Sequence, residues 1–319
     1  MAPPNSPRKG SLQYWPRKRA RKFLPRVNWD AIKTENTSKR GIKGFICYKA
    51  GMSSVLVKDE TPDSMTKGKK IVIPATILEC PPMKIFSVRF YKNGKVAKEV
   101  LSNNLDKELK RKVKLPKNNN KDLSNLEKEE FDGIRLICYS NVKKTGLKKT
   151  PDLSEISLSG DYKEQLEFVK KNLNKELMIS EFFDKGMLID FRGLTKGKGL
   201  QGPVKRFGIT LKSHKSEKGQ RKPGAIGSFH PGRVTFYAPM AGQVGMFTRV
   251  SYNNKIIFVG NPNEKLNLKQ IDNFGDIRTE YLLVTGSVQG PSKRQLILTL
   301  PLRETKKQKK KNYEFIELR

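Results

Sequence analysis

The residues best suited to chemistry lie between Arg192 and Arg233, and the chemistry they favour is contact with phosphate. This stretch contains one acid, Glu217, and glycine or proline interrupts it every few residues. Its few apolar side chains cannot offset the entropy of ordering about forty residues, so we predict a segment that is largely mobile alone and is ordered by a polyanion. The cations are Arg192, Lys196, Lys198, Lys205, Arg206, Lys212, Lys215, Lys218, Arg221, Lys222 and Arg233.

Phe229 occupies the expected tip of this basic loop, in the run SFHPG at residues 228–232. We predict that its ring stacks on nucleotides, which is worth about 1–3 kcal/mol per base; the alternative is a ring folded back onto its own loop. The only histidines, His214 and His230, have neither metal-ligand spacing nor a nucleophile and an acid in catalytic order. We therefore expect both to bind or stack on RNA, with no catalytic residue and no metal site.

The sequence matches two known phosphate-binding motifs only in part. Residues 197–202 fit G-x-G-x-x-G after a strand-like run, but we expect Pro203 and the following cations to break the required helix, and no acid stands about 20 residues further on. The spacing from Gly193 to Lys198 is one residue short of a P-loop, and Gly199 replaces the Ser or Thr. No nucleotide cofactor is predicted.

The composition favours a nucleic-acid partner. The chain of 319 residues has 65 Lys and Arg against 31 Asp and Glu, a formal net charge of +34, and a pI near 10.1. A lysine-rich genome would not explain the small number of acids or the clustering of bases. Such a charge destabilises a compact monomer unless a polyanion neutralises it, and the length suits about two domains.

The location expected is the cytoplasm. No run approaches the roughly 18 apolar residues of a membrane span, and no apolar region follows the basic N-terminus. Cys47, Cys80 and Cys138 are odd in number and lie in strand-like runs. We predict buried free thiols in a reducing compartment.

Residues 1–40 are predicted to form an extended basic arm, because five prolines disfavour a helix. Tyr14 and Trp15 lie between its two basic clusters, where each could stack on an unpaired base or dock on the protein itself. The arm residues expected to contact RNA are Arg8, Lys9, Arg17, Lys18, Arg19, Arg21 and Lys22.

Short apolar runs on either side of a central segment predict a mainly β fold. We expect a closed or nearly closed small barrel, formed by residues 41–91 and 186–302, the second part including the basic loop 192–233. The expected strands are 44–49, 54–58, 72–79, 84–91, 187–191, 234–238, 244–252, 255–260, 281–287 and 294–301.

Residues 92–185 are predicted to form an inserted α+β segment. Apolar residues at three- and four-residue spacing from Tyr162 to Leu177 predict a helix that begins after residues 159–161, and Ser180 could cap a second short helix. Residues 303–319 contain KKQKKK and are expected to be a phosphate-contacting tail rather than a folded element.

A short internal repeat adds three residues to the predicted RNA contacts. Residues 201–206 (QGPVKR) are matched by residues 289–294 (QGPSKR), and each places two cations after a Gly-Pro turn. We predict that both copies face RNA, which adds Gln201, Lys293 and Arg294; chance similarity in a chain rich in Gly, Pro and Lys is the alternative.

Several motifs in order resemble the large-subunit ribosomal protein three family in its archaeal and eukaryotic form, over nearly the whole chain. They are PRKGSL (7–12), PRKRA (16–20), GFICYKAGM (44–52), ECPPM (79–83), TKGKGLQGPVKR (195–206), GSFHPGRV (227–234), GQVGM (242–246) and GSVQGPSKR (286–294).

The resemblance implies a translation-factor-like barrel with an inserted α+β domain, a basic arm and a central finger that reaches toward the peptidyl-transferase centre. It also implies a structural protein that binds 23S-type rRNA near its 3′ end, nucleates subunit assembly and contacts neighbours such as ribosomal proteins L-fourteen and L-twenty-four-e. Residues 195–206 would enter the finger and residues 228–231 would form its tip, where Phe229 replaces the usual tryptophan. His214 lies near a histidine that some members methylate, but the variable spacing prevents transfer of that modification.

Two other functions fit parts of the pattern. A DNA-compacting chromosomal protein would share the charge, but it would bind duplex DNA as well as folded rRNA. An RNA-modifying enzyme would need a cofactor loop or an acid–base pair, which the incomplete glycine motifs do not supply.

Overall fold

The computed structural model describes residues 11, 13–32, 41–116, 131–262, 268 and 270–319. Arg8 and Lys9, two of the predicted RNA contacts, lie outside the described residues. The chain divides into two compact units: unit 1 comprises residues 1–22 and 194–249, and unit 2 comprises residues 23–193 and 250–319.

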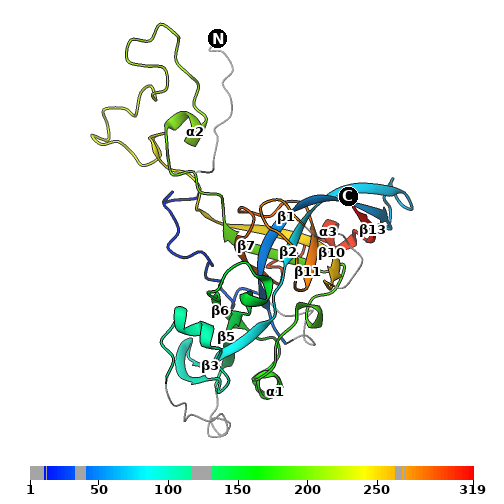
Figure 1. The fold of residues 1–319 in the computed structure, drawn as a ribbon. Coiled ribbons are helices and arrows are strands. Elements are labelled where there is room, and N and C mark those ends of the chain that lie inside the picture. The colour runs from blue at the N-terminus through cyan, green and yellow to red at the C-terminus, as the bar shows by residue number, and fades with distance from the viewer. Residues whose placement is uncertain (1–10, 12, 33–40, 117–130, 263–267, 269) are drawn as a thin grey trace. The chain divides into compact units, whose positions relative to one another are not determined.

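The larger sheet of unit 2 closes on itself, and the prediction of a mainly β chain is confirmed. Its seven strands follow the order β12-β7-β10-β11-β2-β1-β13, and β12 also pairs with β1. Six strands therefore form a ring, and β13 extends it from β1. The strands are β1 (Gly44–Asp59), β2 (Lys70–Glu79), β7 (Leu188–Leu194), β10 (Thr248–Gly260), β11 (Tyr281–Thr285), β12 (Gln295–Thr299) and β13 (Tyr313–Leu318). Six of these strands, β1, β2, β7, β10, β11 and β13, are labelled in Figure 1.

A second, antiparallel sheet of unit 2 has the order β4-β3-β5-β6. Its strands are β3 (Met83–Lys92), β4 (Lys95–Leu101), β5 (Gly133–Ser140) and β6 (Leu153–Ser157), and three 3₁₀ turns accompany it: η1 (Lys107–Arg111), η3 (Val142–Thr145) and η4 (Ile179–Glu181). Helix α1 (Tyr162–Asn172) begins directly after Asp161, as predicted, but it ends before Leu177. The second helix predicted at Ser180 is the single turn η4.

The two sheets share one hydrophobic core. A single cluster of buried side chains contains Phe45 and Leu282 from the larger sheet together with Val88 and Leu136 from the smaller one. Trp29, from the segment predicted as an arm, is also fully buried in this cluster. These contacts join segments far apart in sequence, so the two sheets share this interior. A second cluster of buried side chains, which includes Val55, Ile257 and Leu283, lies in the larger sheet.

The three cysteines are buried free thiols, as predicted. Burial raises the pKa of the Cys138 thiol to about 12. A thiol held in its neutral form is inert.

Buried carboxylates tie the connections of unit 2 to its sheets. Glu79 Oε1 accepts hydrogen bonds from the backbone N–H groups of Arg278 (2.9 Å) and Thr279 (3.2 Å). Glu280 Oε2 accepts from the N–H groups of Ile179 (2.9 Å) and Ser180 (3.2 Å) at the start of η4. These acids satisfy backbone donors that no strand partner reaches.

The prediction of an unfolded C-terminal tail is wrong. Residues after Thr305 form helix α3 (Lys306–Lys310), and β13 then pairs antiparallel with β1. The last carbonyl groups of α3 find a hydrogen-bond donor in the side chain of Lys255. Its Nζ donates to the carbonyls of Gln308 (3.3 Å) and Lys309 (3.1 Å), and also to that of Lys311. The run of lysines is therefore folded by a contact that the sequence pattern does not reveal.

The strand predicted at residues 234–238 is also absent: the segment forms turns. Its aromatic residues pack on another aromatic side chain, with the Trp15 ring 5.3 Å from that of Phe236 and 5.6 Å from that of Tyr237. The apolar character of this run reflects that contact and not a place in a sheet.

Candidate nucleic-acid interface

Unit 1 concentrates the positive charge of the protein. It holds eighteen of the 65 Lys and Arg and one of the 31 Asp and Glu, so it carries +17 of the formal net charge of +34. Unit 1 is about a quarter of the chain, since it spans residues 1–22 and 194–249. The acid is Glu217.

A short two-stranded ladder and one helical turn organise the start of the basic loop. Strand β8 (Leu200–Gln201) pairs with β9 (Gly242–Gln243). Helix α2 (Pro203–Phe207), labelled in Figure 1, follows β8. Pro203 does not break a helix, contrary to our expectation, because proline is well suited to the first helical position. A dinucleotide site is still unsupported, since a two-residue strand and a five-residue helix do not make a βαβ unit.

Gly245 allows the two sides of this loop to approach closely. Its φ is +78°, and a Cβ there would lie 1.9 Å from the carbonyl oxygen of Lys196. The backbone N–H of Lys198 donates to the carbonyl of Val244 (2.9 Å), and the N–H of Val244 donates to that of Gly199 (2.9 Å). A residue with a side chain at position 245 would therefore separate these segments.

Two of the arginines predicted to bind RNA are used inside unit 1. The guanidinium of Arg206 donates to the carbonyls of Met240 (3.0 Å) and Gln243 (3.2 Å), and burial lowers its pKa. The guanidinium of Arg17 lies 4.4 Å from the Phe207 ring and 5.3 Å from the Trp15 ring. Both side chains hold the arm and the basic loop together.

Trp15 and Tyr14 have different environments. Trp15 docks on the protein, against Phe236 and Tyr237. The Tyr14 side chain is 55% exposed, and the guanidinium of Arg249 lies 4.3 Å from its ring. Stacking of Tyr14 on an unpaired base was one of the two alternatives left open by the sequence, whereas Arg249 was not among the predicted RNA contacts. The aromatic character of Tyr14 was visible in the sequence, whereas Arg249 lies 235 positions away from it.

The other predicted cations of unit 1 are exposed. None of them forms an ion pair with another described residue, so their charge is available to a polyanion. They are Lys18, Arg19, Arg21, Lys22, Lys196, Lys198, Lys205, Lys212, Lys215, Arg221, Lys222 and Arg233. His214 and His230 are exposed as well, and Gln201 is half-buried and donates from Nε2 to the carbonyl of Lys198 (2.7 Å).

Phe229 is the most open aromatic ring of the basic loop. Its side chain is 86% exposed, and its one aromatic neighbour among the described residues is His230, whose ring is 5.3 Å away and edge-on. The ring is therefore presented to solvent and not folded into a core.

The second copy of the short repeat has another structure. Lys293 and Arg294 lie in unit 2, in a turn before β12, whereas the first copy opens α2. Lys293 is exposed, but the guanidinium of Arg294 lies 5.2 Å from the Phe23 ring, and burial lowers its pKa. The repeat is thus a similarity of sequence without a similarity of conformation.

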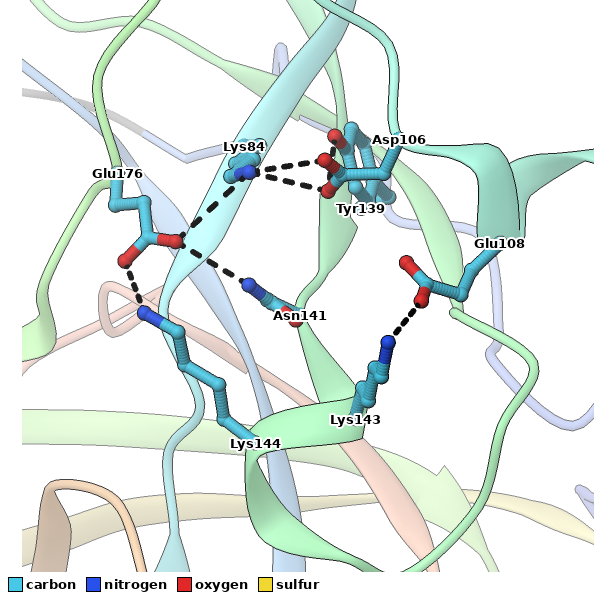
Figure 2. Close-up of polar contacts among 8 residues, drawn as sticks. All are labelled: Lys84, Asp106, Glu108, Tyr139, Asn141, Lys143, Lys144 and Glu176. Atoms are coloured by element: carbon cyan, nitrogen blue, oxygen red, sulfur yellow. Dashed lines mark hydrogen bonds and ion pairs between the residues drawn. The ribbon is translucent and has the colours of Figure 1, made fainter.

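Three lysines on or next to the smaller sheet of unit 2 are paired with acids (Figure 2). Lys84 Nζ lies 3.1 Å from Asp106 and 3.9 Å from Glu176. Lys144 Nζ lies 2.6 Å from the other oxygen of Glu176, and Lys143 is paired with Glu108 at 2.8 Å. These three lysines are therefore less available to a polyanion than the exposed cations of unit 1.

Within the described part of the chain, no helix is long and apolar enough to cross a membrane. In the same residues no three His, Cys, Asp or Glu side chains gather where they could hold a metal ion.

Comparison with known proteins identifies the family. The family model of ribosomal protein L3 matches residues 1–319. Proteins called large ribosomal subunit protein uL3 are similar in sequence: that of Methanocaldococcus jannaschii is 40% identical over 94% of this chain and 92% of its own length, and that of Archaeoglobus fulgidus is 40% identical over 94% and 93%. The uL3 protein of Methanothrix harundinacea is 39% identical over 92% of this chain and 91% of its own length. The chain belongs to the ribosomal protein L3 family and is thus a structural protein of the large ribosomal subunit, not an enzyme.

Proposed function

We propose that the protein is a primary rRNA-binding component of the large subunit, anchored near the 3′ end of the 23S-type rRNA. In this proposal unit 1 enters folded RNA in the cytoplasmic ribosome, and residues 192–233 form a finger that reaches toward the peptidyl-transferase centre. The observation that carries the proposal is the unequal distribution of charge, +17 in about a quarter of the chain. Phosphate contacts are sequence-independent and scale with such charge.

The closed ring of strands supports the proposed translation-factor-like barrel. Strands β1 and β2 precede the segment 92–185 and strands β7, β10, β11 and β12 follow it, so the ring joins two separate parts of the chain. We propose that residues 41–91 and 186–302 form this barrel around the inserted domain, with an arm at 1–40 and residues 303–319 at the C-terminus. Neighbouring ribosomal proteins such as L-fourteen and L-twenty-four-e would contact the protein in the subunit.

The residues proposed to bind RNA fall into two groups. One group would touch RNA directly, whereas Arg17, Arg206 and Arg294, which contact protein groups, would position it. The first group comprises Arg8, Lys9, Lys18, Arg19, Arg21, Lys22, Lys196, Lys198, Gln201, Lys205, Lys212, His214, Lys215, Arg221, Lys222, Phe229, His230, Arg233 and Lys293.

The salt dependence of rRNA binding tests this proposal. Replacing Lys212, Lys215 and Lys222 with Gln should reduce the slope of log K against log salt by roughly 0.7–0.9 for each phosphate that the variant no longer neutralises. A matched control replaces Lys163, Lys171 and Lys175, exposed lysines in or after α1, and should leave the slope unchanged. Equal slopes for the two triple variants would contradict the assignment to unit 1.

Competition between folded rRNA and duplex DNA separates the proposal from a chromosomal role. A ribosomal protein should prefer the rRNA, and it should remain with the large subunit on sucrose gradients at high salt. Equal affinity for duplex DNA, or release at high salt, would favour DNA compaction or a loosely bound assembly factor.

A further inference from the structure

A second aromatic site lies in unit 1, and we propose that it binds one unpaired RNA nucleotide whose base stacks on Tyr14. This inference rests on the proposed function, because it names a pocket and a ligand for RNA binding. It uses none of the residues of the loop tip around Phe229.

The pocket is an open cavity of about 350 Å³ between two segments of unit 1. Residues 13–21 of the arm line one side, and residues 247–249, which follow the basic loop, line the other. Both segments belong to the same compact unit. The volume lies in the range of roughly 300–1,000 Å³ that small-molecule pockets occupy.

Tyr14 is held in place while much of its ring stays open. The Arg249 guanidinium lies 4.3 Å from the Tyr14 ring and 5.2 Å from the Phe247 ring. Its Nη1 also donates to the carbonyl of Thr248 (2.8 Å). With its guanidinium fixed in this way, Arg249 restrains the tyrosine, and the side chain of Tyr14 is still 55% exposed. A restrained ring loses less conformational entropy when a base stacks on it.

The charge around the pocket favours an anionic ligand. Its lining includes Arg17, Lys18, Arg19, Arg21 and Arg249 and contains no acid. A nucleotide combines a flat aromatic base for Tyr14 with a phosphate for these cations. The nucleotide has to be unpaired, because a base inside an A-form helix is stacked between its neighbours and cannot reach a protein ring.

The test uses the full chain and two probes with the same number of phosphates, a single-stranded oligoribonucleotide and an RNA duplex. Tyr14→Ala should weaken binding of the single strand by about 5- to 150-fold, the value of one stacked base. It should leave duplex binding and the salt slope unchanged, because the variant keeps every cation that neutralises a phosphate. Tyr14→Phe, which keeps the ring, should bind like the wild type.

Two controls separate loss of stacking from loss of structure. Tyr14→Leu keeps bulk without an aromatic face and should behave like Tyr14→Ala, and hydrogen exchange of residues 235–249 should stay unchanged in both variants. Photocrosslinking of an oligonucleotide that contains 5-iodouridine should attach the base to Tyr14, as read by mass spectrometry.

The assignment of the pocket to a nucleotide is wrong if Tyr14→Ala binds both probes as tightly as the wild type does, or if the substitution weakens binding of both probes equally. If wild-type binding is strongly salt-dependent in that case, the proposed function still stands. If the wild-type protein binds neither probe nor folded rRNA, the proposed function itself fails. An acidic peptide and unlabelled RNA can also be compared as competitors for the bound single strand. If the peptide displaces it at a lower concentration than the RNA does, the pocket binds a protein partner and the inference is overturned.

Discussion

At the scale of residues, the basic side chains of unit 1 divide into two groups. Arg17 and Arg206 contact aromatic rings and backbone carbonyls of the same unit, whereas Lys212 and Arg221 are exposed. Planar guanidinium groups suit the first role because they stack and donate several hydrogen bonds at once. Loss of an exposed cation should therefore weaken RNA binding without changing the stability of unit 1. Loss of Arg206 should both weaken RNA binding and lower the stability of unit 1.

Phe229 provides the simplest test of the loop tip. Phe229→Ala should change the free energy of unfolding by less than about 0.5 kcal/mol, because the side chain is 86% exposed. In assembled subunits, chemical footprints of the rRNA around the tip should change, whereas Phe229→Trp should preserve them. Identical footprints for the alanine variant and the wild type would remove the tip assignment.

Gly245 tests the close approach inside unit 1. Gly245→Ala should open the contact between residues 196–199 and 244–245, because the new Cβ would meet the Lys196 carbonyl at 1.9 Å and φ is +78°. Hydrogen exchange at Lys198 and Val244 should accelerate. Gly199→Ala is the control, since φ is also positive (+62°) but no atom lies within 4 Å of the added Cβ. If both substitutions accelerate exchange equally, the cause is the strain of a positive φ and not the contact between the new Cβ and the Lys196 carbonyl.

At the scale of elements, buried charged groups hold connections that have no strand partner. Glu79 lies at the end of β2, and Oε2 of its carboxyl has no hydrogen-bond partner among the described residues. Burial raises the pKa of this carboxyl to about 6, although the N–H groups of Arg278 and Thr279 oppose the shift. In the unfolded chain the ordinary pKa of 4.5 applies.

The pH dependence of stability follows from this shift. Between pH 4.5 and pH 6 the unfolded state releases the Glu79 proton while the folded state retains it. The free energy of unfolding should therefore fall as the pH rises through this window, by up to about 2 kcal/mol. Urea unfolding at several pH values should show the slope in the wild type and a reduced slope in Glu79→Gln. The same slope in both proteins would contradict the assignment.

Helix α3 depends on Lys255, although α3 itself consists of residues that favour solvent. Lys255→Met should leave the last carbonyls of α3 without their donor, and hydrogen bonds to a charged group contribute about 1.5–3 kcal/mol each. Trypsin should then cleave within residues 306–311 faster than in the wild type. Lys306→Met, at the exposed start of α3, should not accelerate cleavage at the remaining lysines. Equal cleavage rates in Lys255→Met and the wild type would show that β13 alone holds this region.

At the scale of the whole molecule, residues 1–22 of the N-terminal arm belong to the same compact unit as most of the basic loop. The backbone N–H of Ala20 donates to the carbonyl of Met246 (3.0 Å), and Trp15 covers Phe236 and Tyr237. Deleting residues 1–22 should therefore accelerate hydrogen exchange in residues 235–249 and flatten the salt slope of RNA binding, while exchange in β1 and β2 stays unchanged. Trp15→Ala should reproduce the exchange effect without the full change of slope, because it removes the aromatic packing but no charge.

Much of this organisation could be predicted from local pattern. Val, Ile and Phe alternating between turn residues predicted the strands β2, β3, β11 and β12, and the spacing after Asp161 predicted α1. The excess of lysine and arginine predicted a polyanionic partner, since charge acts at long range and needs no particular fold. The order of several motifs predicted the family, which the comparisons confirm.

Tertiary structure alone decided which residues are partners. β13 is a strand because it meets β1, more than 250 residues earlier in the chain, and α3 ends on a lysine from β10. Trp15 docks because Phe236 and Tyr237 lie beside it, and Arg206 turns inward because the carbonyls of residues 240–243 surround its guanidinium. Sequence by itself determined the charge, the strand-forming runs and the family, because these follow from residue type and order. Contacts between distant segments depend on the closed fold, and no local pattern contains them.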